Sequence, residues 1–314
     1  MSDAEPVVAR GLVKRYGDIV AVAGVDLTVE AGDVFGYLGP NGAGKTTSLR
    51  MMLGLIRPTE GRVELFGRDP LVDGAKALDG VAGFVEGPRF YPYLSGRRNL
   101  RLLADYDEPV SRSRIEAVLE LVELRDRAKD RVGGYSHGMR QRLGIAAALL
   151  RQPRLLLLDE PATGLDPAGM RDMRDLIRRL AGEGLTIVLS SHLLYEVEEV
   201  CNRVAIIGKG SIVYAGPLGE LMATATSEYR LVTRDVERAR AIALNQRGVA
   251  DVVVAGDAIR FAADEDAVAT LTVALGQARV PIMQLVTETA SLEDLFLTLT
   301  GGESSDADRA AVAL

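Results

Sequence analysis

The segment that most constrains the fold of this chain runs from Gly39 to Thr46 and reads G-P-N-G-A-G-K-T. It follows the apolar run 34–38, which predicts a buried strand, and it precedes a stretch with helical spacing of apolar residues. The pattern G-x-x-x-x-G-K-[ST] between a strand and a helix is typical of a phosphate-binding loop, because its glycines let backbone N–H groups turn toward phosphate oxygens. We therefore expect a nucleotide to bind at this end of the strand.

The residue types in the loop each suit the phosphates. Lys45 adds a positive charge, Thr46 supplies a hydroxyl for Mg²⁺, and the helix that follows directs its positive N-terminus at the anion. The expected nucleotide contacts are Gly39, Pro40, Asn41, Gly42, Ala43, Gly44, Lys45, Thr46 and Thr47. The alternative is a glycine-rich turn that matches the pattern by accident, and the strand and helix on either side disfavour it.

Composition excludes several function classes. The 314 residues are 47% hydrophobic and 26% charged, which is typical of a folded chain with room for two domains. The net charge of −7 gives no general attraction for nucleic acid, and no apolar stretch is long enough to span a bilayer. The N-terminus has no features of a secretory signal, and the single cysteine, Cys201, fits a reducing compartment. We therefore expect a cytoplasmic protein.

The first domain is predicted to span residues 6–220. Short apolar runs alternate there with helical patterns, which predicts an α/β fold with a mostly parallel, helix-covered sheet. The expected strands are 24–29, 34–38, 62–66, 82–85, 155–158, 186–190 and 204–207. Residues 88–151 are more charged and carry helical spacing, so we expect a helical subdomain inserted between two strands.

A second, smaller domain is predicted over residues 221–300. Its pattern is strand, helix, strand, strand, helix, strand, which is the order of a ferredoxin-like α+β domain. A last helix is expected to begin at Ser291-Leu292-Glu293-Asp294, a sequence that resembles a capping box. Residues 301–314 are interpreted as a flexible tail.

A second candidate chemical feature follows the strand 155–158. Four consecutive leucines suit a strand buried on both faces, and Asp159 and Glu160 come directly after them. A site that hydrolyses a nucleotide needs a carboxylate near the metal and a group that orients the attacking water. We therefore expect Asp159 to hold Mg²⁺ and Glu160 to act as the general base. In isolation, the pattern would favour two acidic residues that only end a core strand.

Three more segments occur in a fixed order around this strand. Residues 135–142 read Y-S-H-G-M-R-Q-R, residues 162–166 read A-T-G-L-D, and residues 190–192 read S-S-H. Together with the phosphate loop and the acidic strand, they resemble the signature motif, the D-loop and the switch-histidine loop of ATP-binding cassette (ABC) ATPases. The resemblance covers roughly residues 6–220. It implies a P-loop NTPase core with a helical signature subdomain, ATP and Mg²⁺ as ligands, and ATPase activity.

The resemblance also implies roles for single residues. Ser136 and Gly138 would contact the γ-phosphate of a nucleotide held by the other subunit of a dimer, and Asp166 would link the two sites. His192 would help to hold Glu160 and the attacking water. The chain has only two histidines, and both lie in these motifs.

Several positions near the expected nucleotide depart from the family or have two interpretations. Tyr16 lies where the family places an aromatic residue that stacks on adenine, although an ordinary strand tyrosine also fits. Glu86 replaces the family's usual metal-contacting glutamine; it can still coordinate Mg²⁺, but it adds negative charge near ATP. His137 and Met139 replace a glycine and a glutamine of the commonest signature. The aromatic segment 87–94 resembles the surface that family members offer to a membrane subunit.

The whole set of motifs implies a transport function. A single phosphate loop and a single signature imply pairing with a second copy of the chain or a related ATPase subunit. The signature, the Glu86 loop and the stretch 291–296 resemble the ATPase subunits of bacterial drug exporters of the daunorubicin and bacitracin resistance type. Such a subunit would drive export of a drug-like, antibiotic or lipid-like substrate through a separate transmembrane permease, from the inner face of the cell membrane.

Two other classes stay open at this point. A soluble cassette ATPase of translation or DNA repair typically carries two cassettes or a long coiled coil, with basic surfaces for nucleic acid; this chain has one cassette and an acidic balance. A P-loop kinase or GTPase is disfavoured by the signature and the His192 loop. The identity of the transported substrate does not follow from the sequence.

Overall fold

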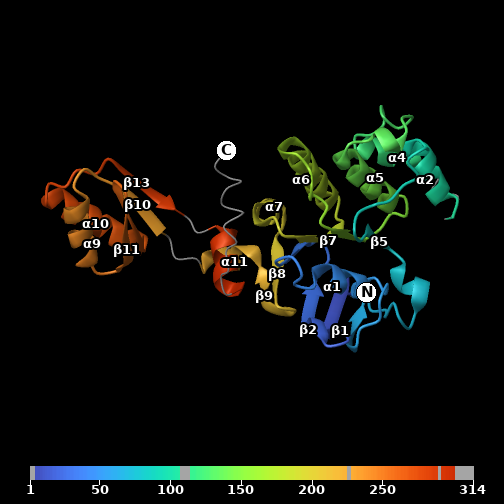
Figure 1. Ribbon diagram of the computed structural model, residues 1–314, viewed down its shortest axis with the longest axis horizontal. Helices are drawn as coiled ribbons and strands as arrows, with labels where there is room; N and C mark the ends of the chain where they lie inside the picture. The colour runs from blue at the N-terminus through green and yellow to red at the C-terminus, as the bar shows by residue number, and fades with distance from the viewer. Residues whose placement is uncertain (1–3, 107–113, 225–227, 289–290, 301–314) are drawn as a thin grey trace. The chain divides into compact units, whose positions relative to one another are not determined.

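The computed structural model describes residues 4–106, 114–224, 228–288 and 291–300, so the predicted tail lies outside the described residues. The chain divides into two compact units, Met1–Leu218 and Gly219–Leu314 (Figure 1). The predicted domain boundary at residue 220 lies close to this division. Among the described helices, none combines the length and the apolar character that a membrane crossing requires.

A six-stranded sheet organises the first unit. Its strand order is β5-β6-β7-β3-β8-β9, and all neighbours are parallel except β8 and β9. The strands are β3 (Val34–Leu38), β5 (Val81–Phe84), β6 (Leu155–Asp159), β7 (Thr186–Ser191), β8 (Arg203–Gly208) and β9 (Ser211–Pro217). Every residue of β3, β6 and β7 is buried, as expected for central strands of a sheet covered on both faces. The predicted parallel sheet is confirmed.

A separate antiparallel sheet corrects one part of the prediction. It contains β1 (Val7–Tyr16), β2 (Ile19–Val29) and β4 (Glu60–Glu64) in the order β2-β1-β4. The runs 24–29 and 62–66 belong here and not to the parallel sheet, and neither β1 nor β9 was predicted. Only Gly17 and Asp18 join β1 to β2, with Tyr16 opposite Ile19. A two-residue connection forces two strands to run antiparallel.

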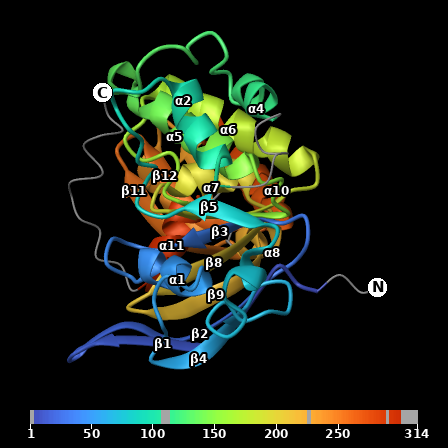
Figure 2. The ribbon, with the colours of Figure 1, turned by 90° about the vertical axis from the view of Figure 1, so that its right-hand side faces the viewer.

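Helices cover the six-stranded sheet on both faces (Figure 2). Helix α1 (Lys45–Met52) lies between this sheet and the antiparallel one, and α6 (Pro167–Gly182) and α7 (Leu194–Val200) lie on the other face. The helical subdomain contains α2 (Gly96–Ala104), α4 (Ile115–Leu121) and α5 (His137–Leu149); short 3₁₀ turns occur at Gly74–Leu78 and Val132–Gly134. The three helices of the subdomain pack against one another, and Leu100, Leu119 and Leu143, one from each, are fully buried.

The second unit contains a four-stranded antiparallel sheet with the order β11-β12-β10-β13. Its elements are α8 (Leu218–Ala223, at the division between the units), β10 (Glu228–Val232), α9 (Val236–Leu244), β11 (Val249–Ala255), β12 (Ala258–Ala263), α10 (Glu265–Gln277), β13 (Gln284–Glu288) and α11 (Leu292–Thr300). The six elements from β10 to β13 follow the predicted order. The capping box also forms, because Ser291 Oγ accepts from the backbone N–H of Asp294 at 3.2 Å, and Asp294 accepts from the N–H of Ser291 at 2.9 Å.

Candidate active site

The strand order brings the separate sequence motifs to one edge of the six-stranded sheet. The phosphate loop follows β3, Asp159 and Glu160 follow the leucines of β6, and His192 follows β7. Strand β7 lies between β3 and β6, and the segment with Glu86 follows β5 on the far side of β6. Since parallel strands end at a common edge, residues from four distant parts of the sequence converge there.

The backbone of the phosphate loop depends on glycine. Gly44 has a φ of 103°, in the left-handed region, and a Cβ built on it would lie 2.4 Å from the carbonyl oxygen of Ala21. A side chain at this position is therefore excluded by both conformation and space. Helix α1 begins at the next residue, Lys45, and directs its N-terminal N–H groups toward the loop.

The ammonium group of Lys45 lies inside the loop. Its Nζ donates hydrogen bonds to the carbonyl oxygens of Gly39 at 2.7 Å and Pro40 at 3.3 Å, and it lies 3.5 Å from Glu160 Oε1. Burial lowers the pKa of Lys45, and the carboxylates of Glu160 and Asp159 oppose that shift. The lysine is thus held where phosphate oxygens of a nucleotide would enter.

Thr46 and Asp159 form a pair of oxygen donors suited to Mg²⁺. Thr46 Oγ1 lies 3.3 Å from Asp159 Oδ1, and the buried Ser190 hydroxyl donates to the same carboxylate oxygen at 2.5 Å. The backbone N–H of Glu86 donates to Asp159 Oδ2 at 3.3 Å. Mg²⁺ typically takes one or two carboxylate or hydroxyl oxygens from the protein and the rest of its ligands from phosphates and water. The donor set therefore fits this metal.

Glu160 is held by several polar groups. Its backbone has a φ of 48°, uncommon for a residue with a side chain, and its N–H donates to Ser190 Oγ at 3.0 Å. Thr163 Oγ1 donates to Glu160 Oε2 at 2.8 Å. His192 Nδ1 lies 3.1 Å from the same carboxylate oxygen, but this contact is an ion-pair distance without hydrogen-bond alignment.

The charge state of Glu160 follows from these neighbours. Burial by itself would raise the pKa of the carboxyl group. The hydrogen bond from Thr163 and the electrostatic influence of His192 and Lys45 act in the opposite direction and outweigh burial, so the pKa of Glu160 lies below its usual value. The group is ionised at neutral pH, which is the state that a general base requires.

Two predicted ligand contacts, Glu86 and Tyr16, have exposed side chains. The side chain of Glu86 is 57% exposed and forms an ion pair with Arg50 of α1, so its carboxylate faces a cation while its backbone contacts Asp159. Tyr16, the last residue of β1, is 47% exposed, and Lys14 Nζ lies 5.1 Å from the centre of its ring. The exposed ring is accessible to a planar ligand.

The signature and D-loop residues begin two helices. Ser136 Oγ accepts from the N–H of Met139 at 3.2 Å at the start of α5, and Asp166 Oδ1 accepts from the N–H of Gly169 at 2.9 Å at the start of α6. Both capping residues are exposed. Gly138 lies in the first turn of α5, where it shares the same helix end with Ser136.

Comparison with known proteins identifies the family of this site. The family model for ABC transporters matches residues 22–163, which include the phosphate loop, the signature and the acidic strand. A bacitracin transport ATP-binding protein, BcrA of Bacillus licheniformis, is 38% identical over 293 residues, which cover 93% of this chain and 96% of that protein. The chain belongs to the ABC transporter ATP-binding proteins. Its nucleotide is accordingly ATP, its metal is Mg²⁺, and its reaction is ATP hydrolysis.

Two further comparisons support the family and the fold of this ABC ATPase. The daunorubicin resistance ATP-binding protein DrrA3 of Streptomyces coeruleorubidus is 34% identical over 93% of this chain and 95% of its own length. A solved ATP-binding subunit of an ABC transporter matches 69% of this chain and 92% of its own with a TM-score of 0.61 and 28% identity. The relatives are named for transport and resistance, which favours the transport interpretation over translation or DNA repair.

The structure adds three side chains to the ABC ATPase site that the sequence analysis did not single out. They are Thr163, which contacts Glu160; Ser190, which contacts Asp159; and Arg50, which contacts Glu86. Ser190 gave a usable signal, because it is a hydroxyl residue at the end of an otherwise apolar strand. Thr163 lies three residues after Glu160, inside the D-loop motif, so its contact is local. Arg50 and Glu86 are 36 residues apart, and their contact has no signal in sequence spacing.

Proposed function

We propose that this ABC ATPase drives the export of an antibiotic or another drug-like or lipid-like molecule through a separate transmembrane permease. Relatives named for bacitracin transport and daunorubicin resistance support this substrate class. The chain would act at the inner face of the cell membrane, held there by the permease. The observation that carries the hydrolytic role is the contact of Glu160 with Lys45, Thr163 and His192 at the end of the phosphate loop.

In this proposal the phosphate loop binds the nucleotide. Its backbone N–H groups and Lys45 take the phosphate oxygens, and the exposed ring of Tyr16 stacks on the adenine. Thr46 and Asp159 hold Mg²⁺, and the Glu86 carboxylate would have to leave Arg50 to join them. When bound, the metal neutralises charge on the β- and γ-phosphate oxygens.

Glu160 is the proposed general base. Its ionised carboxylate accepts a proton from water as the water oxygen attacks the γ-phosphorus and the bond to the bridging oxygen of ADP breaks. Thr163 and His192 fix the carboxylate in one orientation, and His192 would also contact the γ-phosphate. A hydrogen-bonded carboxylate loses less orientational freedom when it takes up the proton.

A second copy or a related subunit completes the proposed site. Ser136 and Gly138 lie at the exposed N-terminus of α5, where backbone N–H groups suit a phosphate from the partner's nucleotide. Asp166, exposed at the start of α6, would link the two sites. ATP would then favour the closed dimer, and hydrolysis would release it by removing the phosphate contact that both subunits share.

An exposed aromatic segment supports the proposed contact with the permease. Tyr91 is 55% and Tyr93 is 65% exposed, and their rings lie 5.7 Å apart. Leu102 and Leu103 of α2 are also exposed, and Tyr106 is 91% exposed. Exposed apolar groups concentrated in one segment favour an interaction site over a free surface.

Affinity capture from native membranes tests this function. The tagged wild-type chain and Glu160→Gln are each purified with their bound proteins, and ATP hydrolysis is measured in both. The proposal predicts a co-purifying multi-span membrane protein that stimulates hydrolysis only with the wild-type chain. Capture of ribosomes or DNA-repair proteins, without a membrane protein, would contradict it.

A further inference from the structure

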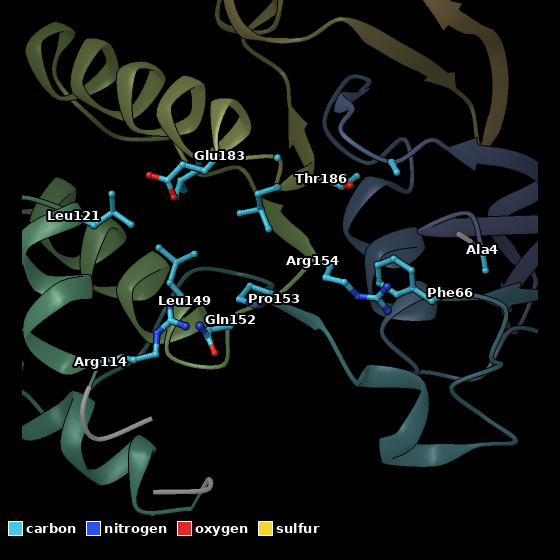
Figure 3. Close-up of a pocket in the computed structure, with 14 residues that line it drawn as sticks. Ala4, Phe66, Arg114, Leu121, Leu149, Gln152, Pro153, Arg154, Glu183 and Thr186 are labelled. Carbon is cyan, nitrogen blue, oxygen red and sulfur yellow. The ribbon is translucent and has the colours of Figure 1, made fainter. Parts of the chain in front are cut away.

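A cavity of about 420 Å³ lies at the opposite ends of β6 and β7 from the candidate active site (Figure 3). Pro153 and Arg154 line it just before β6 begins, and Leu185 and Thr186 line it where β7 begins. Asp159 is the last residue of β6, and His192 follows β7, so both lie at the other ends of these strands. The cavity and the nucleotide site are therefore separate places in the same unit.

The lining is mostly apolar and comes from both the helical subdomain and the sheet core of the first unit. Leu121 and Leu149 belong to the helical subdomain, and Leu180 and Leu185 lie at the end of α6 and before β7. Figure 3 shows Leu121 and Leu149 on one side of the space and Phe66 on the other. A concave volume of a few hundred Å³ with apolar walls and few polar groups is typical of a small-molecule site.

One polar group in the lining lacks a partner. The Nη1 atom of Arg114 is buried and, within the described ranges, donates to no hydrogen-bond acceptor. Figure 3 shows the guanidinium of Arg114 beside Gln152 and Leu149. A buried guanidinium N–H without an acceptor is unfavourable, and a planar carboxylate is the acceptor that this group matches best.

Two other charged side chains line the cavity. The guanidinium of Arg154 stacks on Phe66, with its central carbon 3.9 Å from the ring centre. Glu183, which directly follows α6, also lines the cavity. Two arginines against one glutamate leave the lining with a positive balance. The charge balance and the leucine walls together select a ligand with one anionic group and an apolar body.

We propose that this cavity binds an amphiphilic anion, a carboxylate that carries a short alkyl chain. The carboxylate accepts from the guanidinium of Arg114, and the chain packs on the four leucines. Binding is independent of the proposed role of Glu160, because the two sites lie at opposite ends of the strands. Octanoate is the probe, and 1-octanol is its uncharged counterpart of the same length.

Isothermal titration calorimetry of the full chain with octanoate tests the proposal. We expect saturable binding by the wild type, about tenfold weaker binding by Arg114→Gln, which removes a charge-assisted hydrogen bond, and tighter binding by Glu183→Gln, which removes a repulsive charge. The exposed Arg101→Gln on α2 is the matched control and should bind like the wild type. Octanol should bind at least tenfold more weakly than octanoate, and saturating ADP should leave octanoate binding unchanged.

Several results would overturn the proposal. Equal affinities for octanol and octanoate would show that no contact with the carboxylate contributes to binding. Competition by ADP would place octanoate in the nucleotide site. If Arg114→Gln fails to fold, judged by circular dichroism, Glu183→Gln still decides: unchanged octanoate affinity in that variant would place the carboxylate outside this cavity.

Discussion

Replacing Thr163 with valine removes the one side-chain hydroxyl that, in the described part of the chain, donates to Glu160, and it keeps the side-chain volume nearly unchanged. The hydrogen bond is 2.8 Å long and ends on Oε2, the oxygen that His192 also approaches. In the valine variant, the contact from His192 Nδ1, which lacks hydrogen-bond alignment, is left at this oxygen. The carboxylate therefore gains freedom to rotate. Its pKa also rises, because burial is no longer opposed by the Thr163 hydroxyl.

The size of the effect follows from the type of bond. A hydrogen bond to a charged group contributes about 1.5 to 3 kcal/mol, and we take the lower end because His192 and Lys45 still contact Glu160. If the bond orients the base in the transition state, kcat falls about tenfold. A base with a raised pKa stays protonated to a higher pH, so the acid-side loss of activity shifts to higher pH in Thr163→Val.

The assay is steady-state ATP hydrolysis by the chain with its membrane partner, measured from acidic to neutral pH. Thr163→Ser keeps the hydroxyl and is expected to retain most of the activity and the wild-type pH profile. Hydrolysis by Thr163→Val at the wild-type rate with the wild-type profile would refute the assigned contact, and an equal loss in Thr163→Ser would point to packing of the D-loop instead.

Two further substitutions have matched controls. Gly36→Ala on β3 places a Cβ 2.7 Å from Val197 Cγ1, so overpacking should lower the free energy of unfolding by about 1 to 3 kcal/mol in urea titrations. The control Gly182→Ala meets open space and should be neutral or stabilising. Equal stabilities of the two variants would contradict the close packing of β3 and α7. Ser136→Ala should abolish dimer formation with a non-hydrolysable ATP analogue, measured by size-exclusion chromatography. The control Ser95→Ala removes a comparable helix cap from α2 and should still form the dimer. Dimers of Ser136→Ala would argue against a phosphate contact by Ser136.

Much of the site was predictable because its residues follow strands. The four leucines of β6 indicated a central buried strand, and a parallel sheet necessarily brings the residue after that strand to the same edge as the phosphate loop. Asp159, Glu160 and His192 were placed near Lys45 for this reason. The phosphate loop needed no tertiary information, because its glycines and lysine are contiguous.

The remaining features depend on contacts between distant residues. The pairing of Glu86 with Arg50 requires α1 and the segment after β5 to lie side by side, which no local pattern reports. The antiparallel sheet was not predicted because a two-residue turn at Gly17 and Asp18 reverses the chain directly after β1, and β1 carries no sequence pattern that indicated a strand. The cavity at Arg114 arises from segments of both the helical subdomain and the core, so sequence spacing gives no sign of it.

Glu160 is proposed as the base of an ATP site that a second subunit completes. The most direct measurement compares wild type and Glu160→Gln for ATP binding, dimer formation and single-turnover hydrolysis. We expect Glu160→Gln to bind Mg²⁺-ATP, to accumulate as a dimer and to hydrolyse ATP at least about 10²-fold more slowly. Hydrolysis at a rate close to that of the wild type, by a variant that binds ATP normally, would show that Glu160 is not the base.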